Sequence, residues 1–309
     1  MRIAFMGTPD FSVPCLAALA ESGNEIVGVF CQPDKPVGRK QELQAPPVKV
    51  EALRHGFRVL QPKTLRNGQG LALLEELQPE LVIVVAYGKI LPPDFLEYPK
   101  YGCINIHASL LPKYRGASPI HWAVMAGEKE TGVTVMQMDE GMDTGDILLV
   151  KKLPIPPEAT TEEMFDRLSV LGAEAMLEAI DALKAGSLTP TPQNHAAATS
   201  VGLMTKEMGE IDWSAPAAEI HNRIRGLYSW PGAYTSLHGK RLKLHRARLS
   251  SASSDSTPGT VLVKGGKLLA VCGDGNCIEL LEVQPEGKKR MDAAAFLNGR
   301  GVADGDQFE

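Results

Sequence analysis

The feature that most restricts the fold is an alternation of short apolar runs with stretches of helical periodicity, extending from residue 2 to residue 186. The run at 81–88 is apolar almost throughout, as expected for a strand buried on both faces of a parallel sheet. Strands that alternate with helices form right-handed βαβ units. We therefore predict a doubly wound, mostly parallel, Rossmann-like α/β domain. Its strands are expected at 2–7, 25–31, 81–88, 102–107 and 132–138, and its helices at 12–21, 46–56 and 159–186.

A different pattern begins near residue 205. Five short runs bounded by turn residues alternate in part between apolar and polar positions, which predicts a small antiparallel, OB-like β-barrel. One helix is expected before these runs, at 214–227, and one after them, at 291–301. The preceding segment is polar, contains several prolines and has no periodicity. We predict a catalytic α/β domain at 1–189, a linker at 190–204 and the barrel domain at 205–309.

The composition is that of a soluble globular chain, with 44% apolar and 22% charged residues. No apolar run reaches the ~18–20 residues of a membrane helix, and the first residues do not have the pattern of a signal or transit peptide. The cysteines are scattered, and the lone C-x4-C pair at 272–277 is weak support for zinc. We expect a cytoplasmic monomer with no metal and no membrane partner.

Charge is distributed unevenly along the chain. Residues 1–204 contain 18 Lys and Arg against 24 Asp and Glu, whereas residues 205–309 contain 14 against 13. The stretch 221–254 contains seven basic residues and no acidic one. A net charge of −5 is therefore compatible with a basic face on the barrel, although a solvated charged surface is the simpler interpretation.

Asn105 and His107 are the first candidates for chemistry. Alternate residues of a strand share a face, so both side chains are expected to point the same way near the carboxyl end of the strand. Ligands of open α/β sheets bind at that edge. An amide beside an imidazole can stabilise an oxyanion while the imidazole moves protons. Spacing alone leaves open that both residues only bond backbone groups of a loop.

An acidic loop follows the strand expected at 132–138. Residues 139–146, DEGMDTGD, hold four acids and two glycines that mark tight turns. Such a loop can hold one carboxylate close to His107, in a pair suited to acid–base chemistry. A calcium loop is disfavoured because the EF-hand spacing and its bidentate Glu are missing. A solvated turn remains the alternative.

Two further loops are candidates for ligand sites. The first strand ends in GTPDFS, which is neither a dinucleotide-binding fingerprint nor a phosphate loop, so a plain tight turn is expected there. Residues 109–116, SLLPKYRG, directly follow the His107 region. Their apolar turn suits the wall of a pocket for a flat heterocycle, and Lys113 and Arg115 suit an anionic tail. Without further information, this segment is simply a loop.

Taken together, these motifs resemble those of the 10-formyltetrahydrofolate-dependent formyltransferases. The similarity rests on Asn105-x-His107-x-SLLPKYRG followed by DEGMDTGD. It extends over nearly the whole chain and is greatest, among these enzymes, with those that act on charged initiator tRNA. The additional matching segments are MRIAFMGTPDFSVPCL, FCQPDKPVGRK, KEMGEIDW, RGLYSWPG and GKKRMDAAAFLNGRG.

The resemblance implies a reaction. A formyl group moves from N10 of 10-formyltetrahydrofolate to the α-amino group of methionine esterified to initiator tRNA, through a tetrahedral intermediate. Asn105 and His107 would hold the oxyanion, and Asp143 would tune His107 and help relay the proton. The transfer is direct and needs no covalent nucleophile, so Cys103 is expected to be packing.

The resemblance also implies where the two substrates bind. The folate would contact Ser109, Leu110, Leu111 and Pro112, with Tyr87, Gly88, Ile90, Leu91 and Gly141 in the loops that line the pterin pocket. The tRNA would contact a basic loop and the barrel, through Lys35, Arg39, Lys40, Lys206, Arg223, Lys243 and Arg246. Trp213, Tyr228 and Trp230 are expected to pack in the protein rather than to stack on bases.

The sequence also has to be compared with three alternative functions. A formyltransferase for an amino-sugar nucleotide, or the folate domain of a dehydrogenase, would share the chemistry but lack the basic loop and barrel or need a longer chain. A non-catalytic tRNA-binding protein predicts a broken Asn–His–Asp set, and all three residues are present. A dinucleotide-binding oxidoreductase is disfavoured by the missing glycine fingerprint.

Overall fold

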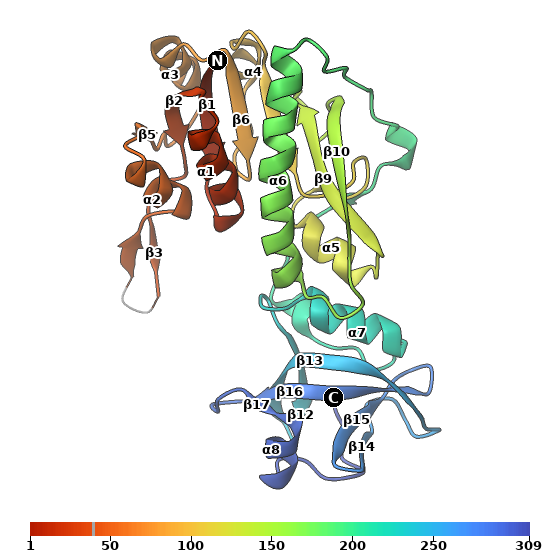
Figure 1. Ribbon diagram of the computed structural model, residues 1–309. Coiled ribbons are helices and arrows are strands. Elements are labelled where there is room, and N and C mark those ends of the chain that lie inside the picture. The colour runs from red at the N-terminus through yellow and green to blue at the C-terminus, as the bar shows by residue number, and fades with distance from the viewer. Residues whose placement is uncertain (39–40) are drawn as a thin grey trace. The chain divides into compact units, whose positions relative to one another are not determined.

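The computed structural model describes residues 1–38 and 41–309, which form two compact units (Figure 1). The first unit comprises 1–117, 130–154 and 165–201, and the second comprises 118–129, 155–164 and 202–309. Arg39 and Lys40, expected to meet tRNA, lie outside the described residues.

Within the described residues, the first unit is built on a seven-stranded sheet in the order β10-β9-β7-β6-β1-β2-β5. Five strands are parallel, whereas β9 is antiparallel to β7 and β10 is antiparallel to β9. The mostly parallel α/β sheet is therefore confirmed. The strand bounds are β1 Arg2–Gly7, β2 Glu25–Phe30, β5 Val59–Leu60, β6 Leu81–Val85, β7 Cys103–His107, β9 Glu130–Gln137 and β10 Ile147–Pro154.

The order of the strands reverses between β1 and β6. From β1 the chain proceeds outward to β2 and β5, and then returns to β6 and continues to β7 on the other side. The loops that follow β1 and β6 therefore diverge, as at the switch point where α/β sheets bind ligands. Thr8, just after β1, donates a 3.1 Å hydrogen bond to the carbonyl oxygen of Tyr87, just after β6. This bond joins the two loops.

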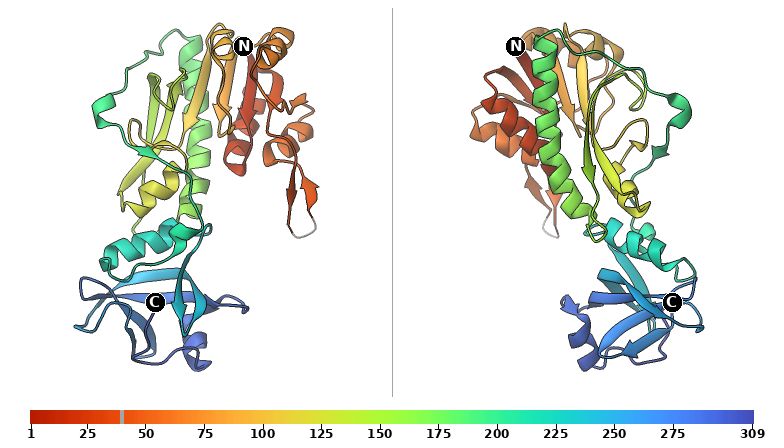
Figure 2. Two further views of the ribbon diagram at one scale, coloured as in Figure 1. Left: turned by 180° about the vertical axis from the view of Figure 1, so that it is seen from behind. Right: turned by 45° about the vertical axis from the view of Figure 1, so that its right-hand side comes forward.

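Helices cover both faces of this sheet (Figures 1 and 2). One face carries α1 (Val13–Glu21) and the Phe165–Lys184 part of α6 (Thr161–Lys184). The ring of Phe11, two residues before α1, meets the Phe165 ring edge to face at 5.2 Å. On the other face, α3 (Gln69–Leu77) and α4 (Pro93–Glu97) cover a core cluster that includes Met6, Val84 and Cys103. A further helix, α2 (Pro47–Arg54), contacts α1.

The start of α6 shows how the sequence sets a helix boundary. Thr160 accepts a hydrogen bond from the backbone N–H of Glu163, whose side chain accepts one from the N–H of Thr160. This reciprocal pair is a capping box, which satisfies two N–H groups left free at the helix start. At the other end, Gly186 has a φ of +67°, which stops the helix as expected.

The segment expected to be a linker makes ordered contacts with the first unit. After α6 it forms an antiparallel bridge between Thr191 and Ile147, then the short helix η2 (His195–Ala197) and strand β11 (Ser200–Val201). That strand pairs in parallel with β8 (Arg115–Gly116). Figure 2 shows this segment running back along the unit from the end of α6. Its backbone therefore lies against the loops that carry the candidate site.

The second unit contains a small antiparallel barrel, as predicted. Its sheet has the order β12-β13-β16-β15-β14, and β17 (Met291–Asp292) pairs with β16. Bridges from Leu237 to Phe308 and from Thr260 to Gln307 join the two outer strands through the tail of the chain. The bounds are β12 Ala233–Leu237, β13 Lys240–Ser253, β14 Val261–Lys264, β15 Lys267–Val271 and β16 Asn276–Pro285, with helices α5 Pro119–Met125, α7 Ala217–Gly226 and α8 Ala293–Asn298 in the same unit.

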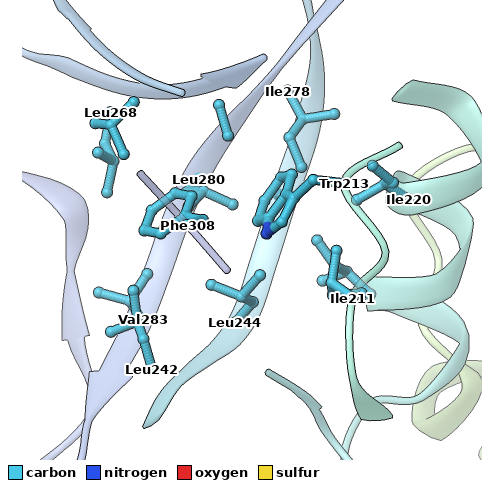
Figure 3. Packing of buried hydrophobic residues seen from close by; sticks show 14 of the residues in the cluster. Ile211, Trp213, Ile220, Leu242, Leu244, Leu268, Ile278, Leu280, Val283 and Phe308 are labelled. Atoms are coloured by element: carbon cyan, nitrogen blue, oxygen red, sulfur yellow. The ribbon is translucent and has the colours of Figure 1, made fainter. Parts of the chain in front are cut away.

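Aromatic packing organises the core of the barrel (Figure 3). The rings of Trp213 and Phe308 stack at a centroid distance of 5.2 Å, and both residues are buried. The indole N–H of Trp213 donates to the hydroxyl of Thr235 at 2.9 Å, so its burial leaves no polar group unpaired. The expectation of packing is confirmed for Trp213 but wrong for Trp230, which is 53% exposed. No helix among the described residues is both long and apolar enough to cross a membrane.

Candidate active site

Three polar side chains meet over β7. Asn105 and His107 share one face of this strand, and Asp143 approaches them from the loop between β9 and β10. Asn105 Nδ2 lies 3.5 Å from Asp143 Oδ1, and His107 Nδ1 lies 3.6 Å from Asp143 Oδ2. The His107 side chain is 7% exposed and that of Asp143 is 15% exposed. The three residues singled out in the sequence are thus brought together in a nearly buried setting.

The hydrogen bond made by His107 Nε2 indicates which ring nitrogen can exchange a proton. Its Nε2 lies 2.9 Å from the carbonyl oxygen of Tyr114, which can only accept, so Nε2 carries a hydrogen. In the neutral ring Nδ1 is then the basic nitrogen. This nitrogen faces Asp143, with 3.6 Å between Nδ1 and Oδ2. The pair is arranged for acid–base chemistry at Nδ1.

The β9–β10 loop is held in shape by its own residues. Asp139 accepts hydrogen bonds from the Gly141 N–H, at 3.0 Å, and from the Thr144 hydroxyl, at 2.7 Å. A side chain at Gly145 would place its Cβ 1.8 Å from the carbonyl oxygen of Gln137, so only glycine fits there. Asp139 therefore acts in the loop itself, and Asp143 is the acid of this loop that reaches His107.

Asp143 is fixed from outside its own loop as well. Its φ is +54°, a left-handed conformation that Asp adopts more readily than most residues. Its Oδ2 accepts a 2.8 Å hydrogen bond from the Gly116 N–H, and its carbonyl oxygen accepts one of 2.9 Å from Gln193. Sequence reasoning missed both partners. Neither has a local signal, because they lie 27 and 50 positions from Asp143.

Residues 109–113 form a rigid turn after β7. The Ser109 hydroxyl donates to the carbonyl oxygen of Lys113 at 2.7 Å. Thr134 on β9 accepts from the Leu111 N–H and donates to the Ser109 carbonyl oxygen. Ser109 and Leu111 are buried, whereas Leu110 and Pro112 are partly exposed. A ligand therefore has access to the side chains of Leu110 and Pro112 but not to the Ser109 hydroxyl.

The loop after β6 presents few of its expected side chains to solvent. Tyr87 and Leu91 lie in the core cluster beneath the loop, and burial raises the pKa of Tyr87 to about 12. Ile90, by contrast, is 73% exposed, and Gly88 and Gly141 are exposed as well. Met142 in the β9–β10 loop is another exposed apolar side chain, at 68%. Ligand contacts at Tyr87 would have to come from its backbone.

The basic stretch 221–254 is partly neutralised or buried by the fold. Arg248 forms two 2.9 Å hydrogen bonds with Glu279, and Arg246 lies 3.5 Å from Glu163. Arg225 is buried and donates to the carbonyl oxygen of Ala159. These partners come from outside the stretch, so the sequence count overstated the free charge. Arg223, another expected contact, donates to the carbonyl oxygen of Met208.

A smaller group of cations stays available on the barrel. Lys240, Arg241 and Lys288 line a groove of about 310 Å³, and Lys243 lines its continuation beside Arg241. Lys240 and Lys243 are exposed and make no ion pair within the described residues. Of the other expected tRNA contacts, Lys35 is exposed on the β3 (Lys35–Val37) and β4 (Glu42–Gln44) hairpin, and Lys206 is exposed before α7.

Cys103 is not a nucleophile. It has no exposed surface and belongs to the core cluster, and burial raises the pKa of its thiol to about 12. The packing role expected for it is confirmed. In the described part of the chain, no three His, Cys, Asp or Glu side chains are grouped so as to hold a metal ion. The α/β domain thus brings an amide, an imidazole and a carboxylate together, a set suited to group transfer by oxyanion stabilisation and proton transfer.

Comparison with known proteins specifies this class. The model of the family described as "Formyl transferase" matches residues 1–180, and the one described as "Formyl transferase, C-terminal domain" matches residues 203–301. A protein from Acidobacterium capsulatum named methionyl-tRNA formyltransferase is 48% identical to the chain, and the match covers 98% of each protein. A protein of the same name from Caldanaerobacter subterraneus is 47% identical, and that match covers 99% of each protein. The chain belongs to the methionyl-tRNA formyltransferase family.

Solved structures of lower identity share the fold. An N-formyltransferase from Helicobacter canadensis, solved with folinic acid and dTDP-3-aminofucose, has a TM-score of 0.70 at 19% identity, covering 92% of this chain and 98% of that one. HypX from Aquifex aeolicus, solved with tetrahydrofolic acid, has a TM-score of 0.63 at 19% identity, covering 98% of this chain and 48% of that one. The likeness supports an α/β formyltransferase domain followed by a β-rich domain.

Proposed function

We propose that this enzyme transfers the formyl group of 10-formyltetrahydrofolate to the α-amino group of methionine on initiator tRNA, in the cytoplasm. Support for the substrates comes from the near full-length relatives named methionyl-tRNA formyltransferase. The single observation that supports the chemistry is the meeting of Asn105, His107 and Asp143 within 3.6 Å. The product, N-formylmethionyl-tRNA, serves translation initiation.

In this mechanism the neutral amine attacks the formyl carbon, and the carbonyl electron pair moves to oxygen. The Asn105 amide N–H donates to the resulting oxyanion. His107 Nδ1 accepts the proton that the amine loses, and Asp143 stabilises the imidazolium. Collapse of the intermediate breaks the bond to N10, whose electron pair takes up that proton, directly or through water. The imidazolium N–H also donates to the oxyanion while the intermediate exists.

The folate is proposed to bind at the loops that carry the switch point and the acidic turn. Met138, Tyr87 and Leu91 pack in one core cluster, so the loop after β6 and the β9–β10 loop are neighbours. Each presents an exposed apolar side chain, Ile90 and Met142, which suits a flat pterin ring. Leu110 and Pro112 would form the adjoining wall, with Gly88 and Gly141 contributing their backbones.

The tRNA is proposed to bind through exposed cations in each unit. On the barrel these are Lys240, Arg241, Lys243 and Lys288, with Lys206 before α7. In the first unit the exposed cation is Lys35, and Arg39 and Lys40, which lie outside the described residues, are proposed to join it on the strength of the family resemblance alone. Exposed, unpaired cations bind phosphate by releasing counterions. Arg223 and Arg246 would make smaller contributions because each already has a partner.

We also propose a domain division at 1–189 and 205–309, with a connecting segment at 190–204, and a monomeric enzyme. The most exposed large apolar side chains are those of Leu203, Ile90 and Leu43. They are single residues at separate places in the chain, so they do not require a second copy of the protein to bury them. Sedimentation equilibrium at micromolar concentration tests the monomer. A mass near 33.3 kDa is expected, and a dimer would contradict the proposal.

The activity is tested by offering the formyl donor with three acceptors in parallel: methionyl initiator tRNA, free methionine and an amino-sugar nucleotide. Transfer to the charged tRNA is expected, with no measurable transfer to the other two. Transfer to the sugar nucleotide alone would retain the Asn105–His107–Asp143 chemistry and refute the tRNA substrate. Release of free formate in place of transfer to any of the three acceptors would retain the formyl donor and refute the tRNA acceptor.

A further inference from the structure

Gln193 joins three segments of the first unit at the candidate site. Its side-chain amide donates to the carbonyl oxygens of Asp143, at 2.9 Å, and Gly145, at 2.7 Å. Its oxygen accepts two hydrogen bonds from the Arg115 guanidinium, at 3.1 and 2.6 Å. Gln193 is 5% exposed and Arg115 is 7% exposed. One buried amide thus connects the β9–β10 loop with the loop that follows β7.

The orientation of this amide is unambiguous. Arginine can only donate and carbonyl oxygens can only accept, so the oxygen of Gln193 must face Arg115 and its nitrogen must face the loop. Both amide hydrogens and both lone pairs of the oxygen are then in use. The positive guanidinium polarises the amide and strengthens its two N–H donors, as in other linked hydrogen bonds. No residue other than glutamine offers this combination at this length.

The position of Gln193 bears on the catalytic carboxylate. Asp143 has a left-handed backbone, and its main chain is held on one side by Gln193 while its side chain is held by the Gly116 N–H. Gly116 directly follows Arg115, which donates to Gln193 and lies 3.1 Å from Nδ1 of His195. The amide therefore fixes the Asp143 backbone and also anchors the residue next to the donor of its carboxylate.

We propose that Gln193 is a positioning residue, which acts through Asp143 to set the carboxylate against His107. This inference rests on the proposed function, since it assigns a role within that reaction. Its side chain is separated from His107 by Asp143 and is not expected to touch either substrate. Misplacement of a catalytic group by about 1 Å can cost ~10²-fold in rate. Loss of Gln193 should therefore lower kcat and leave substrate binding nearly unchanged.

The test is a double-mutant cycle on formyl transfer to methionyl initiator tRNA. Gln193→Met keeps the approximate length and removes all four hydrogen bonds, and it is made both alone and with Asp143→Asn. Alone it should lower kcat at least about 10-fold, with KM for the folate within about 2-fold. In the Asp143→Asn background, Gln193→Met should lower kcat by less than about 2-fold further, because the carboxylate that Gln193 positions is already absent.

A second variant and a matched control separate positioning from folding. Gln193→Glu keeps the partner of Arg115 but loses both donors, so it should fold and still lose kcat. Gln307 also donates to two main-chain carbonyls, those of Pro258 and Phe308, but in the barrel. Gln307→Glu should leave kcat within about 2-fold of wild type. Thermal unfolding of each variant shows whether it is folded at the assay temperature.

The outcomes are distinct. Equal losses from Gln193→Met in the presence and absence of Asp143→Asn would refute the positioning role and leave the proposed function intact. Normal kcat in Gln193→Glu would refute it as well. If the wild-type enzyme does not formylate the charged tRNA, the proposed function fails and this inference fails with it.

Discussion

The candidate site and the basic face of the barrel hold their charged groups in opposite ways. At the site, His107 and Asp143 are largely buried, and each is fixed by a main-chain partner, the Tyr114 carbonyl oxygen or the Gly116 N–H. On the barrel, Lys240 and Lys243 extend into solvent. The first arrangement depends on geometry within a few ångströms, whereas the second depends on the net local field.

This difference predicts different responses to perturbation. Buried, hydrogen-bonded groups are weakly screened, so changes at the site should be large and nearly independent of salt. Exposed cations act through counterion release, so changes on the barrel should be smaller and strongly dependent on salt. Each of the following experiments tests one side of this contrast.

The largest effect is expected at the site itself. Asn105→Ala and His107→Ala should each lower turnover by ~10² or more, because each removes a group that acts in the transition state. Binding of the folate should largely survive, as measured by titration with the unreactive 5-formyl compound. Both losses of turnover should be the same in assays at about 50 mM and about 200 mM salt. Near-normal turnover in either variant would remove that residue from the mechanism.

A somewhat smaller effect is expected from the shape of the acidic loop. Gly145→Ala would bring a methyl group to 1.8 Å from the Gln137 carbonyl oxygen, so the loop that carries Asp143 must shift. We expect kcat to fall about 10-fold or more, since the backbone cannot absorb this contact in place. Gly202→Ala is the matched control, because a Cβ there meets nothing within 4 Å. Equal activity of the two variants would show that the loop shape is not critical.

On the barrel, the free and paired cations should behave differently. Lys240→Ala with Lys243→Ala should weaken tRNA binding and reduce the slope of log K against log salt by about 2. Arg248→Ala with Glu279→Ala removes two opposite charges joined at 2.9 Å and releases Lys267, the second partner of Glu279, so the net charge is unchanged and the slope should stay nearly the same. Filter binding over a salt series measures both. A slope change only in the Arg248 variant would place the contact farther along β13, near Arg248.

The smallest effect concerns stability in acid. Burial lowers the pKa of His121, His221 and His245, all in the second unit. A histidine whose pKa is lowered by folding binds a proton more readily in the unfolded chain, so protonation favours unfolding. The stability of the folded state is therefore unaffected by this histidine at pH values above the unfolded pKa of about 6.5. The free energy of unfolding decreases as the pH falls below this unfolded pKa. The thermal midpoint of the second unit should therefore drop between pH 7.5 and 5.5, the two values compared, and His221→Gln should reduce the drop. A midpoint that rises on acidification would contradict this assignment.

Sequence reasoning performed best where the signal was local. The apolar runs of β6 and β7 marked buried strands, and the spacing of Asn105 and His107 on one strand predicted a shared face. Strand β10 was missed because its residues are partly exposed and include Lys151 and Lys152, so it does not resemble a buried strand. The strand bounds of the barrel followed from its turn residues. The division into domains remains a prediction.

Non-local contacts were the part that the sequence could not reveal. Gln193 stands in a polar segment without periodicity, and its partners Arg115 and Asp143 lie 78 and 50 positions away. In the same way, Glu279 neutralises Arg248 across two strands, 31 positions along the chain. A count of charges within one stretch cannot include such partners. Packing decides which of the charges stay free.

The closure of the barrel has a consequence for how the chain matures during synthesis. Glu309 exchanges two 3.0 Å backbone hydrogen bonds with Ser236 on β12, and Phe308 and Asp306 bond to Gly259 and Val261 beside β14. Until residues 306–309 leave the ribosome, both outer strands keep open edges that can pair with other chains. The α/β unit has by then been complete for about 100 residues of synthesis. A chain truncated after residue 305 and released from the ribosome should therefore combine a protease-resistant first unit with a barrel that is still cleaved. Resistance of both units at that length would show that the barrel closes without its tail.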